Sequence, residues 1–96
     1  MPVVPYRTSD YLKTPEAIAE YLNVVLEDPD SDHEDLLIAL RNVAEAVGGV
    51  SELSRRTGLN RSGLSRALST KNIPKIDTVH KIAKACGVRL QFSACA

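Results

Sequence analysis

The sequence predicts an all-α fold of five helices followed by one short β-strand. Apolar residues recur three and four positions apart, the spacing of a helix with one buried face, over five separate stretches of the chain. Each stretch is bounded by helix-capping residues or by glycine and proline, which interrupt helices. The chain has 96 residues, 44% of them hydrophobic, which suffices for one compact core but not for two.

The first helix is predicted over 15–27. Thr14 serves as its N-cap, and Pro15 occupies the first helical position, where a missing N–H costs nothing. Its apolar stripe consists of Ile18, Tyr21, Leu22, Val25 and Leu26. The apolar segment 2–7 before it contains two prolines, and it is predicted to be an extended arm or a short edge strand.

A second helix is predicted over 33–47, after an acidic linker at 27–32 that contains the turn-forming Pro29. Asp32 is expected to cap this helix, with Asp35 at its third position. The apolar stripe consists of Leu36, Leu37, Leu40, Val43, Ala44 and Val47. The two glycines at 48–49 then end the helix and let the chain bend.

Residues 50–69 combine two short helices and a tight turn in the pattern of a DNA-binding helix-turn-helix. In the first helix, 50–57, Leu53 faces the second helix, and the small Ser54 allows the two helices to cross closely. Gly58 tolerates the positive φ that the turn needs because it has no Cβ, and Leu59 pins the turn to the core.

The second helix of this pair, 61–69, is the predicted recognition helix. Asn60 is expected to cap it, and Leu64, Ala67 and Leu68 form its inward stripe. Its other face carries Arg61, Ser62, Ser65, Arg66 and Ser69. These side chains are short or basic hydrogen-bonding groups without a carboxylate among them, as a groove-reading face requires.

A fifth helix is predicted over 76–86, after a polar loop in which Pro74 prevents the fourth helix from continuing. Its stripe consists of Ile76, Val79, Ile82, Ala83 and Cys86, and Gly87 ends it. Residues 88–92 then alternate apolar and polar, which predicts a short half-buried strand. A lone strand leaves backbone groups unpaired, so we expect it to pair with residues 3–6 or with the same strand of a second subunit.

Charge is divided unequally between the two halves of a chain whose net charge is zero. Residues 1–47 contain ten acidic and three basic residues, a net of −7, whereas residues 48–96 contain nine basic and two acidic residues, a net of +7. Such a dipolar chain offers a cationic face to phosphate and an acidic face to a basic partner.

Neither a metal site nor a catalytic site is predicted. Cys86 and Cys95 lie in no Cys/His cluster, and with only two histidines no four-ligand zinc site has suitable spacing. Cys86 is expected to be a small buried residue and Cys95 an exposed thiol, without a disulfide between them. His80 and Asp77 are spaced to pair on one helix, but no nucleophile is placed beside them, so we expect neither enzyme activity nor a cofactor.

No export signal or membrane segment is predicted. The first residues lack a charged region followed by an apolar run, and no stretch of the sequence approaches membrane-spanning length. We therefore expect a cytoplasmic protein without a membrane partner.

Three segments carry a resemblance to known families: DYLKTPEAIAEYLNVVLED (10–28), LIALRNVAEAVGGVSELSRRTGLNRSGLSRALS (37–69) and IPKIDTVHKIAKACGVRL (73–90). From about residue 33 onward the chain resembles the lambda-repressor-like, Cro/CI-type DNA-binding domains. Nearly the whole chain is similar to the HigA-like antitoxins, the antidotes of addiction modules. One departure is Lys75, which stands where a serine often caps the fifth helix of such domains.

The resemblance implies two parts. Residues 1–31 form an N-terminal arm and an extra helix with an acidic linker, which a generic repressor domain lacks. Residues 32–96 form the lambda-repressor-like helix-turn-helix domain with its C-terminal strand. The resemblance further implies an antitoxin that neutralises a small basic toxin of the RelE/ParE type and represses its own operon.

Matched by their distance from the turn glycine, the base-reading residues of such repressors correspond to Arg61, Ser62 and Arg66, with Ser65 between them. Arginine suits guanine because its planar fork bonds O6 and N7 together. Phosphate contacts are expected from the start of the third helix, the cap of the fourth and the loop after it, at Ser51, Asn60, Thr70 and Lys71. Of Arg55 and Arg56, one could touch phosphate and the other is expected to be a solvated charge.

Toxin contacts are expected from acids on the first helix and the linker after it, with one of two leucines as an apolar anchor. These residues are Glu16, Glu20, Glu27 and Asp28, and Leu22 or Leu26. The competing interpretation is that this helix only caps the DNA-binding core and that its acids are solvated.

We also expect a homodimer, formed through the C-terminal strand or the N-terminal segment, because one module contacts one half-site. Two alternatives stay open: a repressor without a toxin partner, and an interaction protein that does not bind DNA.

Overall fold

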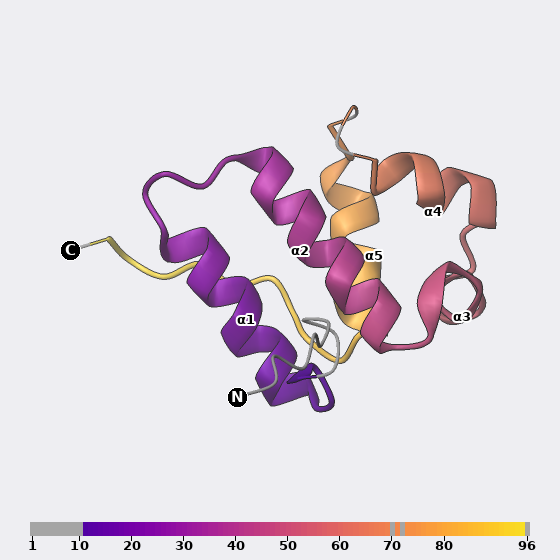
Figure 1. The fold of residues 1–96 in the computed structure, drawn as a ribbon, viewed down its shortest axis with the longest axis horizontal. Coiled ribbons are helices and arrows are strands. Elements are labelled where there is room, and N and C mark those ends of the chain that lie inside the picture. The colour runs from indigo at the N-terminus through magenta and orange to yellow at the C-terminus, as the bar shows by residue number, and fades with distance from the viewer. Residues whose placement is uncertain (1–10, 70, 72, 96) are drawn as a thin grey trace, which may run out of the picture.

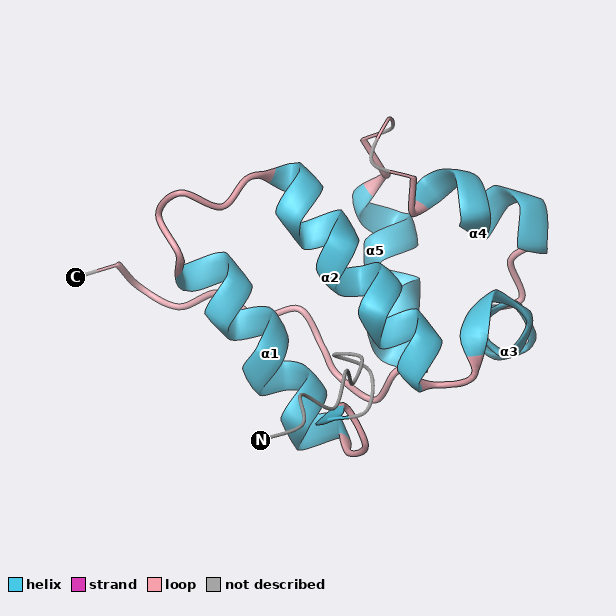
Figure 2. Cartoon of the chain, in the orientation of Figure 1, coloured by secondary structure: helices cyan, strands magenta, loops and turns pink. Residues whose placement is uncertain are grey.

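Five α-helices make up the described part of the chain, residues 11–69, 71 and 73–95 of a computed structural model (Figures 1 and 2). They are α1 (Pro15–Glu27), α2 (His33–Ala46), α3 (Gly49–Thr57), α4 (Arg61–Ala67) and α5 (Ile76–Ala85). The predicted all-α class and the predicted number of helices are confirmed for these residues. None of the described helices has both the length and the apolar character needed to cross a lipid bilayer.

Local side chains determine where the first two helices begin, as predicted. Thr14 Oγ1 accepts a hydrogen bond from the N–H of Ala17 at 3.1 Å. Asp32 Oδ1 accepts hydrogen bonds from the N–H groups of Glu34 and Asp35 at 3.0 and 3.1 Å. The Asp35 carboxylate in turn accepts a hydrogen bond from the N–H of Asp32 at 3.2 Å. This reciprocal capping box satisfies backbone donors that the first turn of α2 would otherwise leave without partners.

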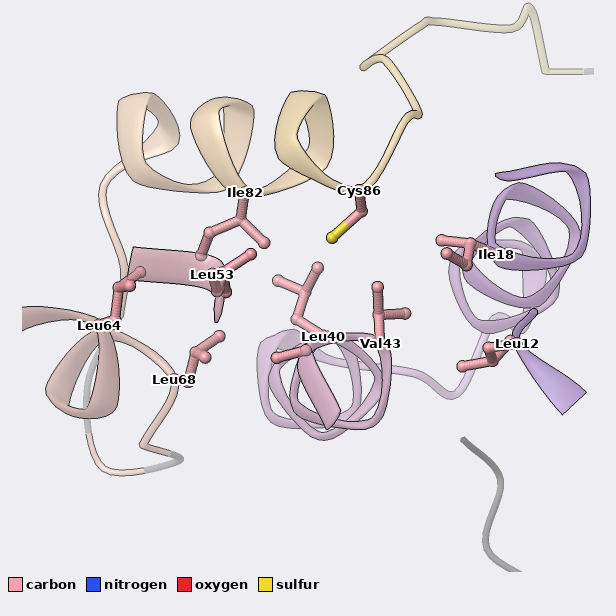
Figure 3. Packing of buried hydrophobic residues seen from close by; sticks show 10 residues of the cluster. Leu12, Ile18, Leu40, Val43, Leu53, Leu64, Leu68, Ile82 and Cys86 are labelled. Carbon is pink, nitrogen blue, oxygen red and sulfur yellow. The ribbon is translucent and has the colours of Figure 1, made fainter. Parts of the chain in front are cut away.

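One hydrophobic core joins all five helices, with α2 between α1 on one side and α3, α4 and α5 on the other (Figures 1 and 3). Leu53 of α3 is fully buried near its centre. The buried cluster consists of Leu12, Ile18, Leu40, Val43, Ala44, Leu53, Leu64, Leu68, Ile82 and Cys86. Because Leu12 and Ile18 belong to it, the N-terminal helix is part of the same core as the α3–α4 pair.

The end of α5 is held against the start of α1. Gly87 has a φ of 85°, and the N–H of Val88 donates to the carbonyl of Ala83 at 3.0 Å, which closes the helix. A Cβ atom at Gly87 would lie 3.0 Å from Cγ of Pro15. The predicted role of Gly87 at the end of α5 is therefore confirmed, and its lack of a side chain also permits this close approach.

The start of α5 differs from the prediction. Ile76, included in the apolar stripe, is 73% exposed because it lies at the first position of the helix, beyond the edge of the core. Ile82 and Cys86 continue the stripe and are buried, as predicted. Lys75 occupies the N-cap position without making a side-chain capping bond.

The predicted strand at 88–92 is wrong. No residue of this segment is in a strand, and its alternating apolar residues do not share a buried face, because Leu90 is 44% exposed and Phe92 is fully exposed. The N–H of Val88 is used to close α5 instead of pairing with another strand. The expected mate at 3–6 lies outside the described residues. An alternating pattern makes a strand only where a partner strand satisfies its backbone, and the segment instead lies along α1 (Figure 1).

Candidate nucleic-acid interface

The turn between α3 and α4 is fixed by hydrogen bonds within the turn itself. Gly58 has a φ of 77°, as the sequence predicted, and its N–H donates to the carbonyl of Ser54 at 2.9 Å. The hydroxyl of Ser54 donates to the carbonyl of Leu59, so this small residue also ties α3 to the chain beyond the turn. Thr57 Oγ1 accepts a hydrogen bond from the N–H of Leu59 at 3.1 Å. Leu59 packs against the core and thereby anchors the turn, as predicted.

Helix α4 is oriented by its cap and by two buried leucines. Asn60 Oδ1 accepts a hydrogen bond from the N–H of Gly63 at 2.6 Å, which confirms Asn60 as the N-cap. A Cβ atom at Gly63 would lie 3.1 Å from that same oxygen, so glycine leaves room for the cap. Leu64 and Leu68 are buried, 1% and 4% exposed, and hold the opposite side of α4 against the core.

The outward side of α4 carries the residues that the sequence predicted to read bases. Arg61, Ser62, Ser65 and Arg66 are all exposed. The helix contains no acidic residue. In Figure 1, α3 and α4 lie at the end of the molecule opposite α1 and the C-terminus. Helix α4 therefore presents two guanidinium groups and two hydroxyls on one accessible surface.

The predicted phosphate-binding residues lie around the edge of this surface. Ser51 is exposed in the first turn of α3, and Lys71 is exposed in the loop after α4. Asn60 is exposed as well, with one side-chain oxygen used by the cap. Ser69 is half-buried and its Oγ accepts a hydrogen bond from the N–H of Lys71 at 3.3 Å, so it helps to shape the loop. Thr70 lies outside the described residues.

Glu52, the acidic residue of α3, is held by two arginines of the same helix. Arg55 donates hydrogen bonds to both carboxylate oxygens, and Arg56 donates through Nε at 2.9 Å. These bonds, with that from Arg55 the largest cause, lower the pKa of Glu52 to about 2. Arg56 also donates to the carbonyl of Ala85 at 3.3 Å, which links α3 to the end of α5. Both arginines are nevertheless exposed, and the side chain of Arg55 is 72% accessible, so it is a solvated charge that is also paired with Glu52.

The acidic residues predicted to meet a protein partner lie on or directly after α1. Glu16, Glu20, Glu27 and Asp28 are all exposed. Asp28 Oδ1 accepts a hydrogen bond from the N–H of Asp30 at 2.9 Å and so also shapes the linker. The surrounding sequence, residues 14–40, contains eight acidic residues and no lysine or arginine. This end of the molecule is therefore strongly anionic.

A groove of about 440 Å³, lined by Glu27 among others, lies between α1, α2, α5 and the segment that follows α5. The two leucines predicted as anchors line it but differ in accessibility, because Leu26 is 62% exposed whereas Leu22 is half-buried against the core. Leu90 and Phe92, both exposed, border the groove on the side of the C-terminal segment. The anionic end therefore also carries accessible apolar side chains.

Other reactive side chains do not come together. Among residues 11–69, 71 and 73–95, no three His, Cys, Asp or Glu side chains are placed to share a metal ion. Asp77 forms its ion pair with Lys81, at 3.2 Å, one residue beyond His80. Cys86 is buried, which raises the pKa of its thiol, and Cys95 is exposed; both cysteines are free, as predicted.

Comparison with known proteins assigns the chain to a family. The sequence profile of the family described as "probable addiction module antidote protein" matches residues 3–94. This chain belongs to that family. An "uncharacterized protein" of Haemophilus influenzae is 34% identical over 86 residues, which cover 90% of this chain and 86% of that protein. No solved structure gives a significant match.

Membership in the antidote family gives the chain a general role. An antidote of an addiction module acts against a toxin, so the chain is an antitoxin and a toxin is its implied partner. The anionic α1 end and the cationic α3–α4 end are therefore two surfaces of an antidote protein.

Two residues of this antidote's α3–α4 surface were missed by the sequence interpretation. Val50 of α3 lines a shallow hollow together with Arg61, Ser62 and Ser65. Arg41 of α2 lines a second hollow that also includes Ser65. Nothing in the pattern distinguished them, because Val50 reads as an ordinary apolar residue and Arg41 stands in the acidic half of the chain.

Proposed function

We propose that this antitoxin binds operator DNA through a helix-turn-helix formed by α3 and α4, represses its own operon as a cytoplasmic homodimer, and neutralises a basic toxin of the RelE/ParE type. The observation that carries the proposal is the outward face of α4, with two arginines, two serines and no carboxylate. The domain that binds DNA corresponds to residues 32–96, whereas residues 1–31 provide the additional helix and its acidic linker.

The exposed face of α4 has the chemistry that base reading requires. Arg61 and Arg66 are both exposed on a helix that is anchored to the core by two buried leucines. A guanidinium group bonds O6 and N7 of guanine together, and serine hydroxyls both donate and accept in the major groove. The cap at Asn60 and the turn at Gly58 hold the start of the helix in one orientation, which is the part that enters the groove in helix-turn-helix proteins.

Phosphate contacts from the edge of this face would set the register on the duplex. Ser51 and Asn60 lie at the two helix starts, and Lys71 supplies a charge from the loop. Phosphate contacts orient a protein on DNA without reading sequence, and they make binding depend on salt. Thr70 and Ser69 complete the proposed set, with Ser69 acting mainly through its bond to the backbone of the loop.

The toxin is proposed to bind at the other end of the molecule. A basic protein is attracted to the acids of α1 and its linker, and Leu26 offers an accessible apolar contact beside the groove. Leu22 is a weaker candidate because it already packs against the core. Separate ends for DNA and toxin allow one antitoxin to bind both at once.

A gel shift with the DNA upstream of the gene tests the DNA-binding part. We expect the wild-type protein to retard this duplex at lower concentrations than an unrelated duplex of equal length. Light scattering of the same protein, with and without the DNA, tests the homodimer. Equal affinity for both duplexes would contradict operator recognition, and failure to retard either duplex would favour the interaction protein that does not bind DNA.

Co-expression with the protein encoded beside the gene tests the toxin-binding part. The double variant Glu16→Gln/Glu20→Gln should weaken rescue of growth, because it removes two charges from the exposed side of α1. The matched control is Asp30→Asn/Glu34→Gln, which removes two exposed acids outside the proposed contact set. Equal rescue by both variants would contradict this placement of the toxin, and a neighbouring protein without toxicity would favour a repressor without a toxin.

A further inference from the structure

We infer that Arg41 of α2 binds a DNA phosphate, so that the DNA-binding surface extends beyond α3 and α4 onto the helix before them. The inference rests on the proposed DNA-binding function and adds a residue from the acidic half of the chain. Its ligand is a backbone phosphate of duplex DNA, the same chemistry that Lys71 is proposed to bind.

The geometry that carries the inference is a hollow of about 420 Å³ between α2 and the end of α4. Arg41 lines it from α2 and Ser65 lines it from α4. Ser69 and Lys71 line it from the loop that follows α4. Two cationic side chains from segments far apart in the sequence thus border one concave surface. Both are exposed, so their charged groups are accessible to a ligand.

This hollow is continuous with the base-reading face. Val50 and Ser65 line both it and the neighbouring hollow that contains Arg61 and Ser62. When Arg61 contacts the groove of a duplex, the neighbouring phosphate backbone therefore lies toward Ser65 and the second hollow. Arg41 lines that second hollow from α2, so a phosphate backbone that passes over the hollow would meet its guanidinium group.

The positive charge of Arg41 stands out from the acidic sequence around it. Arg41 is the one basic residue between positions 14 and 54 of the sequence, a stretch otherwise rich in acids. Glu45 also lines the hollow, so its charged lining consists of two cations and one carboxylate. The serine hydroxyls add hydrogen-bond donors, and a guanidinium bonds phosphate oxygens in a charge-assisted, often bidentate manner. The structural alternative is that Arg41 serves only to balance Glu45, one turn further along α2.

The salt dependence of DNA binding separates these roles. We would measure the affinity of wild type, Arg41→Ala and Lys71→Ala for the upstream DNA and for an unrelated duplex over a range of salt concentrations. Loss of one phosphate contact reduces the slope of log K against log salt by about 0.9. We expect Arg41→Ala to show this reduction on both duplexes, as Lys71→Ala should, with the same relative preference for the upstream DNA.

Alanine at an exposed position inside a helix is compatible with the fold, because it has the highest helix propensity. The matched control is Lys13→Ala, which removes one exposed positive charge at the α1 end and should leave the slope unchanged. A wild-type slope for Arg41→Ala, with normal wild-type binding, would overturn the inference alone. Absence of DNA binding by the wild type would overturn the proposed function and the inference with it.

Discussion

The α3–α4 end and the α1 end of the molecule are held in shape by different kinds of interaction. At the α3–α4 end, short-range hydrogen bonds from Ser54, Thr57 and Asn60 fix the turn and the start of α4. At the α1 end, the groove is formed by segments distant in sequence, namely α1, α2, α5 and the residues after α5. One end is therefore shaped mainly by neighbours in the sequence, and the other by tertiary packing.

The two ends also differ in how their charges are arranged. The carboxylate of Glu52 on α3 is paired with two arginines of the same helix, and α4 itself contains no acidic residue. The acids of α1 stand in a stretch of sequence that has no lysine or arginine. The proposed binding of DNA and of a basic toxin would benefit from this separation, because each partner would be repelled by the end that carries its own sign of charge.

The largest expected effect comes from breaking the core that the two ends share. Leu53→Ala removes a fully buried side chain and should lower the free energy of unfolding by about 2–5 kcal/mol. Because the same core contains residues of α1, DNA binding and toxin neutralisation should weaken together. Urea denaturation measures the loss of stability. Leu26→Ala, at a 62% exposed position, is the control and should change stability by no more than about 0.5 kcal/mol. Loss of only one activity in Leu53→Ala would show that the two ends are independent.

A smaller and more selective effect is expected on the outward face of α4. Arg61→Ala and Arg66→Ala should each cost about 1–3 kcal/mol in binding to the upstream DNA and should relax sequence preference. Neutralisation of the toxin should be unchanged, because these residues lie at the opposite end of the molecule from α1 (Figure 1). Gel shifts and growth rescue, measured on the same variants, test both statements. Normal DNA binding by both variants would show that α4 is not the recognition helix.

The difference between short-range hydrogen bonds and tertiary packing explains which parts of the structure the sequence predicted. The caps at Thr14, Asp32 and Asn60 and the turn at Gly58 were correct, because each depends on a bond to a residue two to four positions away. The strand at 88–92 was wrong, because a strand depends on a partner elsewhere in the molecule. Its residues instead close α5 and border the groove.

The candidate site was also predicted from the sequence only where local structure decides it. The exposure of Arg61, Ser62, Ser65 and Arg66 followed from the period of α4 and its buried leucines. That Arg41 and Lys71 line the same hollow could not be predicted, because it depends on how α2 packs against the α3–α4 pair. Likewise, helical spacing allows Arg55 and Arg56 to pair with Glu52 but does not determine that both do so, which only the side-chain positions show.

The smallest expected effect is a pH dependence of the stability of the folded protein, caused by Glu52 at the α3–α4 end. The pKa of Glu52 is lowered from 4.5 to about 2 in the folded protein, so the unfolded chain takes up this proton first as pH falls. The stabilisation from Glu52 is therefore fully present above about pH 4.5 and is lost as pH falls toward 2. Glu52→Gln lacks this titration, so its stability deficit relative to wild type should be constant above about pH 5 and should shrink toward pH 2. Denaturation at several pH values measures this difference.

Arg55→Gln removes the main donor to Glu52 and should move the pH range over which this stability is lost toward the ordinary pKa of a glutamate. A deficit that stays the same from pH 5 to pH 2 would mean that the two arginines do not stabilise the folded state through this carboxylate.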